Sequence, residues 1–118
     1  MGEVIVKGKL SNPATGASKD IKFLVDTGAT ISVVPETILK SLNIKPIDKD
    51  TFELAGGNTK VFRLGEAVIQ VNGKRRTFTV AFGAKRSQSL LGLVVLETLG
   101  FRVDPVSRKL VKRRLMMY

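Results

Sequence analysis

One acidic residue stands where an apolar segment stops, and it is the first candidate for chemistry. Asp26 follows Phe23-Leu24-Val25 and precedes Thr27-Gly28-Ala29-Thr30. A carboxylate in that place needs hydrogen-bond donors or a proton, because burial without either is costly. A carboxylate held in this way is suited to general acid–base catalysis. Because Asp-Thr-Gly also occurs in ordinary turns, a structural role for Asp26 stays open on this segment alone.

The composition narrows the chemistry that the chain can perform. Its 118 residues contain no cysteine and no histidine. Their absence excludes disulfides, zinc sites with sulfur or imidazole ligands, cysteine nucleophiles and every relay that passes a proton through histidine. Carboxylate, lysine and hydroxyl groups remain, and neither a metal nor another cofactor is expected.

The elements that position Asp26 follow from apolar periodicity and turn residues. Residues 3–10 predict a strand, residues 11–18 predict a turn, and a second strand then leads into Asp26. Residues 30–34 are again rich in β-branched side chains. Pro35 is expected to open a short helix that buries one apolar face.

Two glycine-containing turns predict hairpins in the middle of the chain. Residues 51–64 predict a hairpin whose tip is Ala55-Gly56-Gly57-Asn58. That tip has almost no side chains, so it moves easily and lets backbone approach a ligand closely, although an ordinary turn explains it equally well. Residues 66–82 predict a second hairpin that turns at Asn72-Gly73, a dipeptide suited to the type I′ turn.

The last quarter of the chain begins with a second short apolar segment. Leu90-Leu91-Gly92 predicts a buried strand followed by a glycine at a close backbone approach. Residues 93–99 predict a helix that Gly100 terminates, and residues 101–111 predict a last hairpin.

No repeat, linker or low-complexity tract interrupts this series. A single domain is therefore predicted over residues 1–118, with a core at about residues 3–111 and a basic and apolar tail at 112–118. The predicted fold class is all-β, a barrel-like domain with one or two short helices. The first residues carry an acid and only a short apolar run, so neither a signal peptide nor a membrane span is expected, and the expected location is cytoplasmic.

The order of these features resembles the retropepsin family across about residues 3–111. Leu-Val-Asp-Thr-Gly-Ala at residues 24–29 resembles the active-site motif of the retroviral-type aspartic proteases, and Leu90-Leu91-Gly92 resembles their second signature. The resemblance implies a retropepsin-like closed barrel with a flap hairpin. It also implies an aspartic endopeptidase that acts on protein or peptide substrates.

The resemblance assigns a role to each matching residue. Asp26 would be catalytic, Thr27 would brace two active-site loops across a dimer, and Gly28 would leave room for substrate backbone. The glycines of the 55–58 tip would form the flap, and Gly92 would pack beneath the active-site loop. The implied site residues are Asp26, Thr27, Gly28, Ala29, Ala55, Gly56, Gly57, Asn58, Leu90, Leu91 and Gly92.

Two positions depart from the viral pattern. Viral enzymes usually have an acid directly after Asp-Thr-Gly-Ala and an arginine directly after the second-signature glycine, whereas this chain has Thr30 and Leu93. The ion pair between those positions, which contributes to the viral style of dimer contact, is therefore missing. With the long segment after Gly100, this departure indicates a closer resemblance to cellular and prokaryotic single-domain members.

The number of active-site motifs predicts the assembly. A pepsin-like enzyme needs two Asp-Thr-Gly loops, and this chain has one, because Asp104-Pro105-Val106 cannot serve as the second. Catalysis therefore requires a symmetric homodimer. Two carboxylates about 3 Å apart at an effective dielectric constant near 20 repel by roughly 5 kcal/mol, so the pair shares one proton, as in aspartic proteases generally. One Asp26 would then activate water while the other polarises the scissile carbonyl.

The charge of the chain leaves other functions open. Lys and Arg total 20 against 10 Asp and Glu, which gives a net charge of +10 and favours anionic partners. A small basic barrel that binds nucleic acid, and an inactive retropepsin-fold interaction module, are therefore the alternatives. The basic runs at 74–76, 85–86 and 112–114 have no interleaved aromatic residues, which argues against nucleic-acid binding beyond non-specific attraction.

Overall fold

The computed structural model describes residues 3–117. Two short helices and nine strands follow one another in these residues. Along the chain they are β1 (Ile5–Ser11), β2 (Ser18–Val25), β3 (Ser32–Pro35), α1 (Glu36–Ser41), β4 (Asp48–Glu53), β5 (Thr59–Val71), β6 (Lys74–Gly83), β7 (Leu90–Leu91), α2 (Leu93–Leu99), β8 (Phe101–Asp104) and β9 (Lys109–Lys112).

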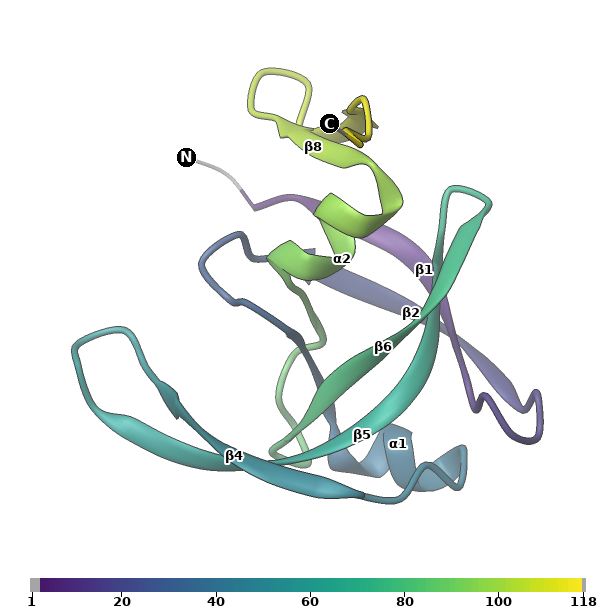
Figure 1. The fold of residues 1–118 in the computed structure, drawn as a ribbon, viewed down its shortest axis with the longest axis vertical. Helices are drawn as coiled ribbons and strands as arrows, with labels where there is room; N and C mark the ends of the chain where they lie inside the picture. The colour runs from purple at the N-terminus through teal and green to yellow at the C-terminus, as the bar shows by residue number, and fades with distance from the viewer. Residues whose placement is uncertain (1–2, 118) are drawn as a thin grey trace.

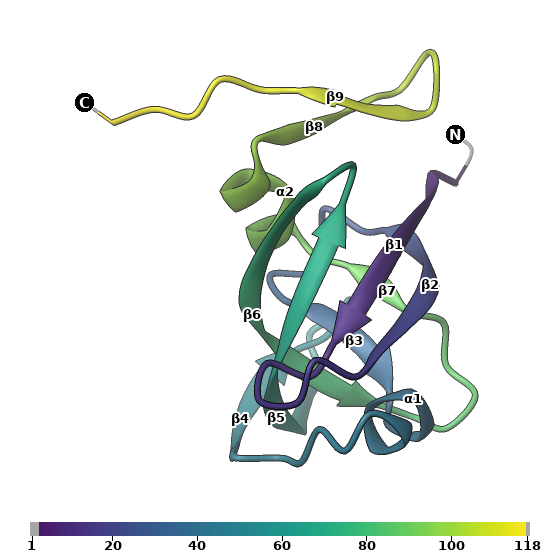
Figure 2. The same cartoon turned by 90° about the vertical axis from the view of Figure 1, so that its right-hand side faces the viewer.

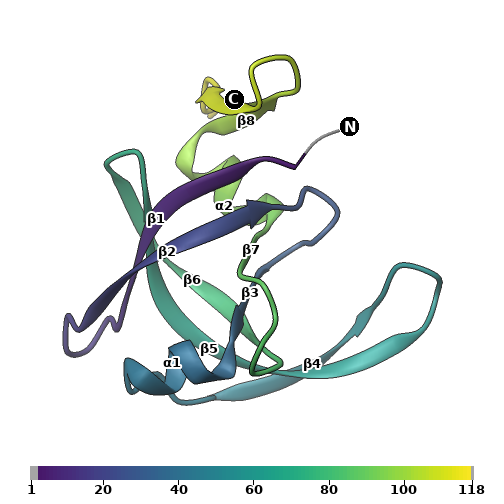
Figure 3. The same cartoon turned by 180° about the vertical axis from the view of Figure 1, so that it is seen from behind.

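The strands of the main sheet close into a barrel (Figures 1 and 3). In the described residues, seven strands are hydrogen-bonded in the order β1-β2-β7-β3-β6-β5-β4, and β1 also pairs with β5. That extra antiparallel pairing joins Leu10 to Ile69 and completes the ring. The predicted all-β closed barrel with two short helices is confirmed.

Apolar side chains from every wall of the barrel fill its interior. Both helices add to this core, as their apolar faces predict, and α1 contributes Leu39 while α2 contributes Val95, Leu96 and Leu99. The largest fully buried apolar side chains are Phe23, Leu10, Leu39, Ile69, Leu91, Val34, Val71, Val80 and Val95.

The longest strand, β5, differs from the prediction. The two predicted hairpins share it, because the chain continues through Gly65 without a break. The outer half of β5 pairs with β4, and the inner half pairs with β1. A Cβ on Gly65 would lie 3.0 Å from the Phe82 ring and 3.1 Å from the Lys45 carbonyl. The glycine therefore serves close packing inside a strand and not a turn.

Both helices are short, and their ends lie where the sequence predicts. Pro35 is the N-cap of α1, and Gly100 ends α2 with a φ of 79°, a left-handed conformation that glycine adopts without strain. Within residues 3–117, neither helix has the length and apolar character needed to cross a membrane.

The last two strands form a separate hairpin that stands at one end of the barrel (Figure 2). Its return strand is tied to the end of α2, because the Arg113 amide donates to the Gly100 carbonyl at 2.7 Å. In the turn, the amide of Val106 donates to the Asp104 carboxylate, and this hydrogen bond lowers the pKa of that carboxyl. The ionised carboxylate therefore stabilises the turn fully when the pH is above the ordinary pKa of an aspartate. This stabilisation is lost as the pH falls through the lowered pKa of Asp104.

One buried amide links the β1–β2 turn to the end of α1. Asn12 donates through Nδ2 to the Leu42 carbonyl at 2.9 Å, and its Oδ1 accepts from the Ala14 amide at 2.8 Å. We expect Asn12→Ala to lower the free energy of unfolding by about 1–3 kcal/mol, because it leaves a buried carbonyl without its donor. Urea unfolding at a fixed protein concentration measures this loss.

The same turn supplies a matched control for that variant. The Thr15 hydroxyl accepts from the Ala17 amide at 3.2 Å, but it does so in solvent. Thr15→Ala is expected to change the free energy of unfolding by no more than about 0.5 kcal/mol. Equal losses in the two variants would contradict a special role for the buried amide.

Candidate active site

Asp26 occupies the first position after β2, in a tight turn at the edge of the barrel. Its amide donates to the Leu91 carbonyl at 2.9 Å, and the Ala29 amide donates to its carbonyl at 3.2 Å. Its carboxylate oxygen Oδ1 accepts from the Gly28 amide at 2.9 Å. The side chain is half-buried. The turn therefore fixes the carboxylate by backbone hydrogen bonds and leaves it open to solvent.

The residues that follow Asp26 form an open loop on one chain. Thr27 and Gly28 are exposed, and Ala29 is half-buried. A Cβ on Gly28 would lie 3.2 Å from Oδ1 of Asp26, so glycine keeps the space beside the carboxylate free. Two hollows lie elsewhere on the described residues, and no residue of 26–31 lines either one. One chain thus presents the carboxylate on an exposed loop.

The second apolar segment lies directly beneath this loop. β7 pairs in parallel with β2, where Val25 is in register with Leu91, and it pairs antiparallel with β3. The Leu24 amide also donates to the Ser89 carbonyl at 2.8 Å. β7 therefore lies between the two strands that carry the ends of the Asp26 loop.

Gly92 packs closely against the backbone at the end of this loop. A Cβ at that position would lie 2.5 Å from the carbonyl carbon of Ile31 and 2.9 Å from the amide nitrogen of Ser32. The Gly92 amide donates to the Ser32 hydroxyl at 2.9 Å, and Ser32 is fully buried. No residue other than glycine fits there without displacing backbone.

Sequence reasoning missed the contribution of Ser32. The sequence carried a signal for it, because Ser32 is a polar residue that interrupts the apolar run Ile31-Ser32-Val33-Val34. A buried hydroxyl needs a partner, and the partner is the Gly92 amide on the other side of the loop.

The first residues of α2 complete the attachment of the loop. The Leu93 amide donates to the Ala29 carbonyl at 2.8 Å, and the Val94 amide donates to the Thr30 carbonyl at 3.1 Å. Thr30 and Leu93 are the positions where the viral pattern has an ion pair. In this chain backbone hydrogen bonds connect the same two segments, while the Leu93 side chain is 37% exposed.

The glycine-rich hairpin extends away from the barrel as an arm formed by β4 and β5 (Figure 1). Every residue from 53 to 61 is exposed. At the tip the Leu54 amide donates to the Asn58 carbonyl at 2.6 Å, and Gly56 and Gly57 have φ values of 96° and 91°. A Cβ on Gly56 or Gly57 would meet nothing within 4 Å, so the tip around these glycines lies in open space.

The structure therefore groups the predicted residues into two sets. The Asp26 loop and Leu90-Leu91-Gly92 are joined by hydrogen bonds, and the 55–58 tip lies apart from both at the end of its arm. Among the described residues, no three acidic side chains come together as metal ligands. The arrangement offers one oriented carboxylate for acid–base chemistry and, apart from it, one exposed glycine-tipped hairpin.

A closed barrel that holds one Asp-Thr-Gly loop above a hydrophobic-hydrophobic-Gly strand defines the retropepsin-like class of aspartic proteases. The chain belongs to the family described as gag-polyprotein putative aspartyl protease, whose sequence profile matches residues 14–98. Among curated protein sequences, none matches the chain significantly.

Solved structures agree with this family. A retropepsin-like aspartic protease from Rickettsia conorii is 28% identical, with 87% of this chain and 85% of that chain covered and a TM-score of 0.55. The EIAV protease complexed with the inhibitor HBY-793 is 17% identical, with 87% and 93% covered and a TM-score of 0.63. The simian foamy virus (mac) protease is 22% identical, with 78% and 90% covered and a TM-score of 0.57.

These structures support the branch that the sequence indicates. The two viral proteases share the fold with this chain. The Rickettsia protein has the higher identity of the three, which agrees with the predicted resemblance to cellular and prokaryotic members. The backbone comparison does not separate the branches, since the EIAV protease has the higher TM-score.

Proposed function

We propose that the protein is an aspartic endopeptidase that hydrolyses peptide bonds as a homodimer, with Asp26 of each subunit at the two-fold axis. One observation carries the proposal. The chain presents a single, hydrogen-bonded and solvent-open Asp26 carboxylate on a surface loop, within the fold of a protease family. A second copy of the same loop supplies the missing carboxylate and converts the surface into a cleft.

The two carboxylates share one proton and divide the chemistry between them. The ionised Asp26 takes a proton from water as the water oxygen bonds to the scissile carbonyl carbon, and the protonated Asp26 gives its proton to the carbonyl oxygen. In the second step the first carboxyl protonates the amide nitrogen, the other takes back a hydroxyl proton, and the C–N bond breaks. The products are an acid and an amine, and the pair again holds one proton.

The remaining residues of the site position the substrate and the loops. The exposed Thr27 faces solvent in one chain, where it is available to brace the partner loop, and Gly28 leaves space for substrate backbone beside Asp26. The arm that ends at Ala55-Gly56-Gly57-Asn58 acts as a flap that closes over bound peptide. Closure of such a hairpin excludes water other than the attacking molecule.

The dimer surface includes the exposed apolar start of α2. Leu93 and Val94 are 37% and 39% exposed, and their amides hold the Asp26 loop. We expect Leu93→Asp to raise the dimer dissociation constant by at least about tenfold, because the carboxylate must be desolvated when two copies of the loop meet. Sedimentation velocity and specific activity, each measured over a range of protein concentrations, report this change.

Ile47→Asp is the matched control for that experiment. Ile47 is 70% exposed and lies before β4, outside the Asp26 loop and α2. The same substitution there is expected to leave the dissociation constant unchanged. A wild-type protein that stays monomeric while its specific activity is independent of concentration would overturn the dimer. A dimer that releases no new peptide termini from a denatured protein mixture would instead indicate an inactive interaction module.

A further inference from the structure

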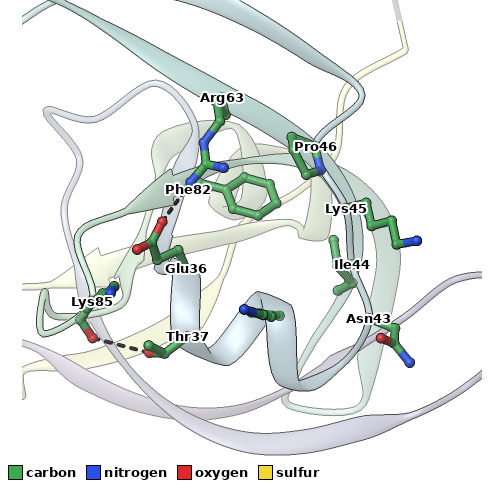
Figure 4. A pocket seen from close by; sticks show the side chains of 10 residues that line it. Glu36, Thr37, Asn43, Ile44, Lys45, Pro46, Arg63, Phe82 and Lys85 are labelled. Atoms are coloured by element: carbon green, nitrogen blue, oxygen red, sulfur yellow. Dashed lines mark hydrogen bonds and ion pairs between the residues drawn. The ribbon is translucent and has the colours of Figure 1, made fainter.

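A second site lies outside the Asp26 loop, in a hollow of about 620 Å³ between α1, the segment before β4, β5 and the end of β6 (Figure 4). Its volume is within the range of about 300–1,000 Å³ that ligand pockets occupy. No residue of 26–31, 55–58 or 90–92 lines it. The hollow is therefore separate from the proposed catalytic site.

The floor of this hollow is apolar. Ile44 and Phe82 are core residues of which only a small part is accessible in the hollow, and the exposed Pro46 lines it beside them. The Arg63 guanidinium lies 5.2 Å from the centre of the Phe82 ring and pairs with Glu36 at 2.6 Å (Figure 4). These two contacts place the guanidinium at the rim of the hollow.

The rim is strongly basic. Lys40, Lys45 and Lys85 are exposed, and they surround the floor together with Arg63, while Glu36 is the single acid. Among the described residues the ion pairs join Arg63 to Glu36 and Arg113 to Glu97, so the three lysines are without a carboxylate partner. An apolar floor within a ring of free positive charge is complementary to an acidic ligand with an apolar centre.

We propose that this hollow docks an acidic peptide segment of another protein, in which carboxylates flank one aromatic or large aliphatic side chain. The apolar side chain packs against Ile44, Pro46 and Phe82, and the flanking carboxylates pair with the rim lysines. Such a segment binds through both the apolar floor and the basic rim, whereas a simple polyanion binds through the charge alone. The proposal does not depend on the chain being a protease.

A second hollow is also lined by lysines but lacks an apolar floor. It lies over β1, β2 and the end of β5, and Lys7, Lys9 and Lys22 line it with Asp20. Its remaining lining is mostly polar or glycine, with Ile21 as the exception. This second hollow offers charge of the same sign but little surface for an apolar anchor, so it is the internal reference for non-specific attraction.

The test is a binding titration of the fluorescein-labelled peptide Asp-Glu-Phe-Glu-Asp, followed by fluorescence anisotropy. The Asp26→Asn variant of the full chain is used so that cleavage does not interfere. We expect the Lys45→Glu/Lys85→Glu double substitution to weaken binding by at least about tenfold and the Lys9→Glu/Lys22→Glu double substitution, in the second hollow, by no more than about twofold. Both doubles change the net charge equally, and thermal unfolding verifies that each is folded.

The peptide itself provides a test that needs no change in the protein. Replacing its phenylalanine by alanine is expected to weaken binding at least about fivefold, because the floor loses its apolar contact. Equal weakening by both double substitutions, or binding that ignores the phenylalanine, would overturn the proposal in favour of general electrostatic attraction. Tighter binding of a single-stranded oligothymidylate that competes with the peptide would overturn it in favour of a phosphate polyanion.

Discussion

Replacing Asp26 by asparagine is expected to lower kcat/KM for peptide hydrolysis by roughly 10³-fold, the scale of a lost general acid–base group. An amide keeps the shape of the side chain, and its oxygen still accepts the Gly28 amide, so the loop is expected to keep its geometry. It cannot take a proton from water or share one with the partner carboxylate. Turnover of a synthetic peptide, with the variant verified by mass spectrometry, measures the loss.

Asp104→Asn is the matched control for this variant. Asp104 also accepts backbone amides in a turn, including that of Val106 at 3.0 Å, but it lies in the β8–β9 turn, outside the Asp26 loop. The control is expected to keep kcat/KM within about twofold, in line with other exposed substitutions. If both variants retained full turnover and unchanged dimer content, the catalytic group would have to be sought elsewhere in the chain.

The Asp26 loop could be predicted from the sequence because its determinants are local. An apolar strand, an acid and a small-residue turn are adjacent in the chain, and β2 ends at Val25 as that pattern requires. The same holds for Leu90-Leu91-Gly92, where the apolar pair forms β7 and the glycine begins the next helix. Residue types alone also fix the caps Pro35 and Gly100.

Closure of the barrel is implied by the family resemblance but by no local pattern, because it depends on contacts between distant residues. The pairing of β1 with β5 joins Leu10 to Ile69, and no local pattern encodes that distance. Gly65 illustrates the difficulty. A glycine between two apolar runs suggests a turn, but in the fold this glycine lies within a strand and makes room for the Phe82 ring and the Lys45 carbonyl. The hydrogen bond between Ser32 and Gly92 spans 60 positions for the same reason.

The hollow near α1 was hidden from the sequence as well. Its lysines are scattered over α1, the segment before β4 and the loop after β6, and only Lys85 belongs to a basic run, at 85–86. Only the fold places Lys45 and Lys85 around Ile44 and Phe82. The basic run at 74–76 is obvious in the sequence, yet none of its members lines either principal hollow.

Gly92→Ala is expected to cost about 3 kcal/mol of folding free energy, at the upper end for an inserted methyl group. The new Cβ would meet backbone atoms of Ile31 and Ser32, which cannot swing aside as a flexible side chain can. We also expect kcat/KM to fall by roughly 10²-fold in the protein that remains folded, because a displacement near 1 Å in the Asp26 loop misaligns the reacting groups. Urea unfolding and peptide turnover well below the unfolding midpoint measure the two effects.

Two further variants separate the causes of that loss. Gly16→Ala introduces the same methyl group at a glycine with a φ of 78° and open space around it, so it reports only backbone strain, about 1–2 kcal/mol, and should leave turnover unchanged. Ser32→Ala removes the hydroxyl that accepts the Gly92 amide but adds no volume. If steric contact positions the loop, Gly92→Ala lowers kcat/KM far more than Ser32→Ala does. If the hydrogen bond positions it, the two variants are similar. Wild-type turnover in Gly92→Ala would show that Asp26 is positioned without the segment beneath it.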